Sequence, residues 1–130
     1  MKCILDTHFL LWIALGVPRL DEFPWLGRYA PWGVSPVSFL EVKFLDEVGR
    51  LQVRIEAFME AVKQDPRFIL DEVPLPHLIQ HAFPLSWTRD PFDRLLSAHS
   101  LARRTPLCTV DAEVLRHHQH VPPELASRSV

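Results

Sequence analysis

The chain has 130 residues, of which 48% are hydrophobic and 23% are charged, and its formal net charge is −2. These values suit one globular domain over residues 1–130, and they exclude global disorder and a bulk polycation that binds nucleic acid by charge alone. Two cysteines, Cys3 and Cys108, are too few for a disulfide scaffold, so we expect free, buried thiols. Neither a signal-peptide pattern nor a membrane-spanning run of roughly 18 apolar residues is present, so we expect a cytoplasmic protein.

Apolar runs punctuated by glycine and proline predict alternating strands and helices in the first half of the chain. Ser35 and Pro36 form the best helix start there, with serine at the N-cap and proline in the first turn. Predicted strands cover residues 2–6 and 33–34, and predicted helices cover residues 7–15, 21–29, 36–48 and 55–63. The helix from residue 36 has an apolar stripe formed by Val37, Leu40, Phe44, Leu45 and Val48.

The clearest helix start in the second half is the segment Asp90-Pro91-Phe92-Asp93. Asp90 suits the N-cap, and Asp93 falls where an acidic side chain can return a hydrogen bond to the capping residue. Predicted strands cover residues 68–70 and 107–110, and predicted helices cover residues 76–83, 91–104 and 112–117. Strands separated by helices require crossover connections, so we predict an α/β protein with a three-layer α/β/α architecture and a mainly parallel sheet.

Four acidic residues lie near the ends or starts of the predicted elements: Asp6, Glu41, Asp93 and Asp111. Open parallel sheets place their sites at the carboxyl ends of the strands, where Asp6 and Asp111 are expected. Clustered carboxylates without a nearby Cys or His pair favour Mg²⁺ or Mn²⁺, and phosphodiester hydrolysis is the natural chemistry of such a site. Each acid also has a structural alternative, since the aspartates can cap helices and the glutamate can be a solvated helix residue.

Four segments of the chain resemble, in the same order, the motifs of a known family. They are Ile-Leu-Asp-Thr-His-Phe-Leu-Leu-Trp at 4–12, Val-Ser-Pro-Val-Ser-Phe-Leu-Glu-Val-Lys at 34–43, Arg-Asp-Pro-Phe-Asp-Arg-Leu-Leu-Ser-Ala at 89–98 and Thr-Val-Asp at 109–111. Together they are similar to PIN-domain ribonucleases of the VapC type, the toxins of type II toxin–antitoxin systems. The chain departs from the family at Pro36, where a small residue is usual, and at Trp87-Thr88, where relatives often carry histidine.

The resemblance implies a PIN-like fold, Mg²⁺- or Mn²⁺-dependent cleavage of single-stranded RNA, a small antitoxin partner and a homodimer. By position, it assigns the catalytic and metal-binding roles to Asp6, Glu41, Asp93 and Asp111. It also implies that Thr109 supports the last acid, and that Asp90 has a structural role as a cap.

Several other residues have a functional and a structural interpretation. Arg89 and Arg94 flank the third acid, so they are candidates for binding RNA phosphates or are solvated surface charges. The three histidines between residues 117 and 120 lack a second ligand cluster, so we interpret their metal-like spacing as incidental. The aromatic residues crowded in the first quarter either pack in the core or form an apolar groove for an antitoxin helix: Trp12, Phe23, Trp25, Tyr29 and Trp32.

Two other functions compete with the ribonuclease. A phosphatase with an aspartyl nucleophile would carry Asp-x-Asp after the first strand, but His8 stands at the third position. A non-catalytic PIN-like module that binds RNA or protein is the remaining alternative.

Overall fold

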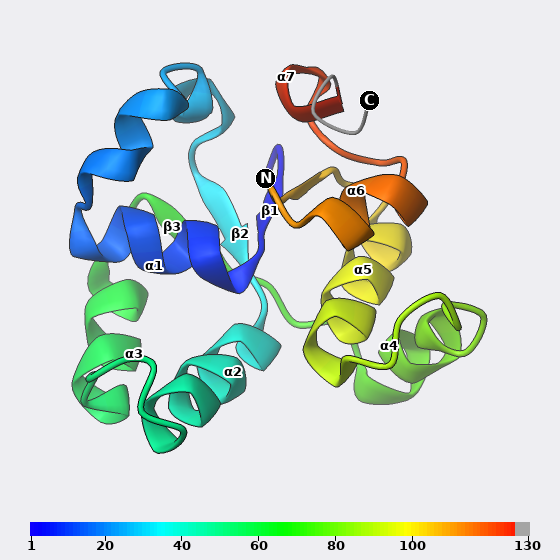
Figure 1. The fold of residues 1–130 in the computed structure, drawn as a ribbon, viewed down its shortest axis with the longest axis horizontal. Coiled ribbons are helices and arrows are strands. Elements are labelled where there is room, and N and C mark those ends of the chain that lie inside the picture. The colour runs from blue at the N-terminus through cyan, green and yellow to red at the C-terminus, as the bar shows by residue number, and fades with distance from the viewer. Residues whose placement is uncertain (127–130) are drawn as a thin grey trace.

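The central layer of this computed structural model, which describes residues 1–126, is a sheet of four parallel strands in the order β3-β2-β1-β4 (Figure 1). The strands are β1 (Ile4–Leu5), β2 (Trp32–Val34), β3 (Phe68–Leu70) and β4 (Leu107–Cys108). The four last residues of the expected domain, 127–130, lie outside the described residues. Helices cover both faces of the sheet, so the predicted three-layer α/β/α fold is confirmed.

The helices predicted at residues 7–15 and from residue 36 onward are present, with ends within one residue of the prediction. The α-helices are α1 (Thr7–Leu15), α2 (Pro36–Glu47), α3 (Ile55–Gln64), α4 (Leu75–Ala82), α5 (Pro91–Arg103), α6 (Ala112–His117) and α7 (Pro123–Ala126). The predicted helix over 21–29 is wrong, because two short 3₁₀ helices, η1 (Pro18–Glu22) and η2 (Leu26–Tyr29), occupy that region. Pro24 lies between them, and a proline has no N–H to continue a helix.

Successive residues at β1, an inner strand, point to opposite faces of the sheet. Cys3 and Leu5 pack with Phe9 of α1 and with the apolar side of α3, whereas Ile4 packs with Leu96 of α5. Helix α4 packs outside α5 through a smaller apolar cluster. Cys3 and Cys108 are free and buried, as expected, and their thiols are hydrogen-bonded neighbours.

Helix α2 buries a different stripe from the predicted one. Its buried residues are Ser38, Phe39 and Val42, whereas Leu40 is 64% exposed and Phe44 is 45% exposed. The small Ser38 side chain faces the start of α1, where its hydroxyl lies 3.1 Å from that of Thr7. The close approach of α1 and α2 therefore decides which face of α2 is buried, and it leaves large apolar side chains at the surface.

Within residues 1–126, no helix combines the length and the apolar character that a membrane crossing requires.

Candidate active site

Asp6 and Asp111 lie at the carboxyl ends of neighbouring strands and cap the helices that follow. The pairing of Leu5 with Cys108 places β1 beside β4. Asp6 accepts a hydrogen bond from the Phe9 N–H at 2.9 Å, and Asp111 accepts one from the Val114 N–H at 3.0 Å. The structural alternative is therefore correct for both acids, and it does not exclude a second role.

Thr109 joins these two acids. Its hydroxyl accepts a hydrogen bond from the Asp111 N–H at 3.1 Å, and it donates one to the Asp6 carboxylate. This contact agrees with the support that the resemblance implied for the last acid. Thr109 is buried, so water does not compete for its hydroxyl. The pairing of β1 with β4 and this hydroxyl therefore hold Asp6 and Asp111 side by side.

Asp90 caps α5 as predicted, but Asp93 does not return a hydrogen bond to it. The Asp90 carboxylate accepts hydrogen bonds from the N–H groups of Phe92 at 2.8 Å and Asp93 at 3.1 Å. However, the N–H of Asp90 donates to the Thr88 hydroxyl at 3.1 Å, so it does not need the return bond predicted from Asp93. The Asp93 carboxylate is therefore available to the space in front of the helix.

Glu41 extends from α2 and is half-buried. Its carboxylate interacts with the side chain of Thr7, the first residue of α1, and this interaction opposes the rise in the Glu41 pKa that burial causes. The same packing of α1 on α2 that buries Ser38 therefore brings Glu41 close to Asp6.

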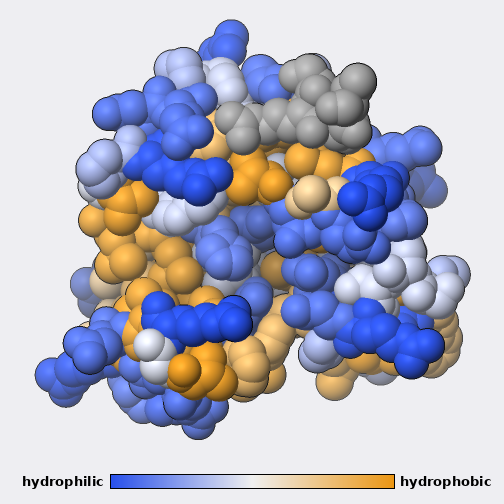
Figure 2. Space-filling model, in the orientation of Figure 1, coloured by the Kyte–Doolittle hydropathy of each residue, from blue (hydrophilic) through white to orange (hydrophobic). Residues whose placement is uncertain are grey.

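Glu41, Asp90, Asp93 and Asp111 line one cleft, near the region where α1, α2 and α5 begin at the middle of the view (Figure 1). The cleft has a volume of about 530 Å³ and is lined by His8, Glu41, Phe44, Leu45, Arg50, Asp90, Pro91, Phe92, Asp93 and Asp111. A smaller hollow of about 200 Å³ shares His8 and Asp111 with the cleft and adds Asp6. Figure 2 shows hydrophilic side chains at the middle of this face, with apolar surface over α1 beside them.

The carboxylates perturb one another. The pKa of Asp93 is raised to about 7 by burial first and then by the charges of four other acids: Asp90, Asp111, Glu41 and Asp6. Burial also raises the pKa of Glu41 and of Asp6, although hydrogen bonds to each carboxylate oppose the rise. All four predicted site acids and Asp90 therefore belong to one electrostatic cluster.

The sequence did not indicate two basic residues of the cleft, namely His8 and Arg50. His8 lies in the first turn of α1, two residues after Asp6, and it lowers the pKa values of Asp6 and Glu41. The sequence could have indicated this position, because a residue two places after a helix cap lies in the first turn, close to the cap. Arg50 follows α2 in a connection, and nothing in the local sequence distinguishes it from other surface arginines.

The two predicted phosphate-binding arginines differ. Arg94 donates from Nε to the Ala82 carbonyl and from Nη2 to the Phe83 carbonyl, both at 2.9 Å, so its guanidinium holds the end of α4 against α5. Arg89 is exposed beside the start of α5. A phosphate contact therefore stays a prediction for Arg89, whereas Arg94 has a structural role in this fold.

An aromatic pair forms part of the cleft wall. The rings of Phe44 and Phe92 have their centroids 5.7 Å apart and are tilted by 43°. Phe44 is 45% exposed, so much of its ring faces open space beside Asp93. Two elements far apart in sequence thus contribute an aromatic surface next to the acids.

The aromatic residues of the first quarter mainly pack in the core, as one of their two interpretations predicted. Phe23 and Trp32 are buried, and Trp12, Trp25 and Tyr29 are partly buried against them. Trp12 stacks on Phe23 with centroids 6.0 Å apart. Beside them, an apolar hollow of about 430 Å³ extends from α1 to the end of α2 and shares His8 and Arg50 with the cleft.

The C-terminal histidines also have packing roles. His118 is buried, with Nε2 2.9 Å from the Ser100 hydroxyl, and burial lowers its pKa to about 4. His117 stacks on Trp87 with centroids 5.1 Å apart.

The acid cluster fits a hard cation by its chemistry, because carboxylate oxygens are the ligands that Mg²⁺ and Mn²⁺ prefer. As the side chains stand in residues 1–126, however, no group of three or more His, Cys, Asp or Glu is arranged to hold a metal ion. Binding an ion therefore requires some of the carboxylates to approach one another. The chain matches no protein-family model and no curated protein, so the functional argument rests on this cleft.

Proposed function

We propose that this chain is a metal-dependent endoribonuclease of the PIN type, and that it hydrolyses phosphodiester bonds of single-stranded RNA at the acid cleft. The observation that carries the proposal is the gathering of five carboxylates around one cleft, where burial first and then the charges of the other four acids raise the pKa of Asp93 to about 7. Such crowding destabilises a fold, and strongly perturbed acids in a cleft are typical of functional sites. A bound divalent cation would relieve the repulsion.

The residues that would hold Mg²⁺ or Mn²⁺ are Glu41, Asp93 and Asp111 in the cleft and Asp6 in the adjoining hollow. When bound there, the ion supplies an activated water and neutralises charge on the phosphoryl group. The chain itself fixes Asp6 through the Phe9 N–H and the Thr109 hydroxyl. Glu41 and Asp93, which are half-buried and cap no helix, are the acids whose side chains can adjust to an ion.

The other residues of the cleft favour a flexible polyanion as the substrate. The Arg50 guanidinium provides positive charge beside the acids, and the His8 imidazole adds hydrogen-bonding groups. This local charge matters because the formal net charge of the whole chain is −2. Phe44 and Phe92 offer an aromatic surface on which an unpaired base can stack. Bases in a duplex are already stacked, so this surface supports a single-stranded substrate.

Cleavage of a fluorescent, unstructured RNA tests the proposal. We expect cleavage in Mn²⁺ or Mg²⁺, none in EDTA, and a loss of at least about 100-fold in Asp6→Asn and Asp93→Asn. Asparagine is also a good helix cap, so the first variant keeps the start of α1. Asp21→Asn is the matched control, because Asp21 is an exposed acid in η1 outside the cleft. Wild-type rates in correctly folded Asp6→Asn and Asp93→Asn proteins would refute the proposal.

We further propose that the nuclease is a toxin whose small antitoxin partner covers the apolar hollow beside the cleft. Leu11, Leu15 and Leu45 line this hollow, and Leu15 is 51% exposed. An antitoxin helix placed there would lie next to His8 and Arg50 and would restrict access to the acids. Co-purification with a short protein encoded directly upstream, lost in Leu15→Arg, tests this assignment, and light scattering of the isolated chain tests the homodimer.

A non-catalytic PIN-like module that binds RNA or protein is the second candidate. One observation favours it: no metal-ligand group is preformed in residues 1–126. The two functions differ in one measurement, since the module would bind RNA in Mn²⁺ and leave it intact.

A further inference from the structure

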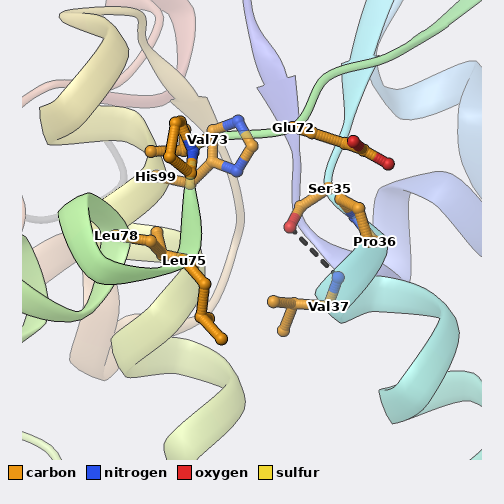
Figure 3. A pocket seen from close by; sticks show the side chains of 9 residues that line it. Ser35, Pro36, Val37, Glu72, Val73, Leu75, Leu78 and His99 are labelled. Atoms are coloured by element: carbon orange, nitrogen blue, oxygen red, sulfur yellow. Dashed lines mark hydrogen bonds between the residues drawn. The ribbon is translucent and has the colours of Figure 1, made fainter.

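A second cavity lies away from the acids, at the carboxyl ends of β2 and β3. It has a volume of about 410 Å³ and is lined mainly by apolar side chains, among them Val37, Val73, Leu75 and Leu78. Figure 3 shows Leu75 and Leu78 on one side and the start of α2 on the other, with His99 between them at the inner end. This volume is within the range of small-molecule sites in proteins.

The tautomer of His99 follows from its partner. The side chain is 1% exposed, and Nε2 lies 2.7 Å from Oδ2 of Asp71. Arg103 donates to the same oxygen at 2.8 Å, which keeps Asp71 a carboxylate that can only accept hydrogen bonds. Nε2 must therefore carry the hydrogen. Burial lowers the pKa of His99, so the ring is neutral and Nδ1 is an acceptor.

Nδ1 of His99 has no hydrogen-bond partner within residues 1–126, although it is buried. Figure 3 shows one ring nitrogen directed toward the space between Leu75 and the Ser35–Val37 side of the cavity. The Ser35 hydroxyl, which accepts the Val37 N–H at 3.1 Å, lines the same cavity but makes no hydrogen bond to Nδ1. A buried acceptor without a donor is unfavourable, and in native proteins it usually has a partner.

We propose that this cavity binds a small, mostly apolar molecule with one N–H or O–H group, which it donates to Nδ1 of His99. The apolar lining would bury the body of the ligand, and the single acceptor would fix its orientation. The lining also carries the Ser35 hydroxyl and the Glu72 carboxylate, so an ordered water is the competing occupant, and the experiment below distinguishes it from a ligand. The site is separate from the acid cleft and does not depend on the proposed nuclease activity.

Indole and indene are matched probes, since they share a shape and only indole has an N–H. We expect protein-observed NMR to show both binding at Val73 and Leu78, with indole about threefold to tenfold tighter. In His99→Phe, which keeps a ring and loses the acceptor, the two probes should bind equally. Phe83→Ala, which removes an exposed ring outside the cavity, should leave the preference unchanged.

The nitrogen spectrum of His99 in the wild-type protein provides a second measurement, which applies even if His99→Phe fails to fold. We expect hydrogen on Nε2 alone, and a shift of the Nδ1 resonance when indole is added but not when indene is added. Equal affinities in the wild type, probe-induced shifts confined to other residues, or a crystal structure with only ordered water at Nδ1 in saturating indole would each overturn the proposal.

Discussion

Replacement of Asp93 by asparagine should stabilise the metal-free protein at the expense of its activity. The pKa of Asp93 is raised from 3.8 to about 7 in the folded state. Between these values the folded chain binds more protons than the unfolded chain, so the free energy of unfolding falls as the pH rises. Above pH 7 the penalty is complete, and it vanishes below the unfolded pKa. An amide at position 93 removes the penalty altogether.

The magnitude follows from the size of the shift. A rise of roughly three units at about 1.4 kcal/mol per unit gives an upper limit of about 4 kcal/mol. Because Asp93 is only half-buried and solvent screens its neighbours, we expect about half of this limit, roughly 2 kcal/mol at pH 8. At pH 4.5 the difference should shrink to about a quarter of that value. In a domain of this size, 2 kcal/mol corresponds to a rise in Tm of about 7 °C.

Urea unfolding of the wild type and Asp93→Asn at pH 8 and pH 4.5, in EDTA and low salt, measures this difference directly. Comparison of the two proteins at each pH cancels the other titrating groups that they share. Added Mg²⁺ should stabilise the wild type at pH 8 by mass action and should stabilise the variant less. The reasoning is refuted if the variant is no more stable than the wild type at pH 8, or if its advantage is the same at both pH values.

Three further predictions concern the cleft wall, a helix cap and a buried histidine. Phe44→Ala should raise the KM for single-stranded RNA about tenfold, and Phe83→Ala should leave it unchanged in the same steady-state assay; equal effects would exclude base stacking at Phe44. Asp90→Ala should lose about 1 kcal/mol of stability in urea and Asp90→Asn much less, whereas equal losses would show that charge, not capping, matters. His118 has a folded pKa of about 4, below its unfolded 6.5, so the stability that it contributes is present above pH 6.5 and is lost as the pH falls toward 4. His118→Gln should therefore flatten the decline in unfolding free energy between pH 7 and 4.5 by about 2 kcal/mol, and parallel declines would contradict the assignment.

The sequence predicted the elements well where local signals agree. The caps at Asp6, Ser35, Asp90 and Asp111 each begin a helix at the predicted residue, because a side chain that satisfies free N–H groups is a local property. The first and last strands are shorter than the predicted 2–6 and 107–110, since an apolar run shows burial but not the extent of pairing, whereas β3 matches its prediction and β2 is one residue longer. The helix predicted over 21–29 does not form, because Pro24 interrupts the backbone hydrogen bonds between η1 and η2.

The sequence predicted the acidic residues of the site, but not the aromatic and basic residues that line the cleft beside them. Strand ends give the positions of Asp6 and Asp111, since they depend on the sheet alone. Phe44 was assigned to the core, because a helix rich in apolar residues offers more than one stripe and only the packing of Ser38 against Thr7 decides between them. Arg50 lies in the loop between α2 and α3, and the path of this loop places it at the cleft. The path of a loop cannot be predicted from a helical or strand pattern of apolar residues.

The double use of aspartates as helix caps has a consequence for how related chains should be judged. Asp6, Asp90 and Asp111 each accept backbone N–H groups at the start of a helix, so selection for stability alone would keep them. Glu41 and Asp93 cap no helix, so only the proposed activity would keep them. Under the proposed function, the acids at positions 41 and 93 should therefore distinguish active from inactive homologues better than the acids that cap helices.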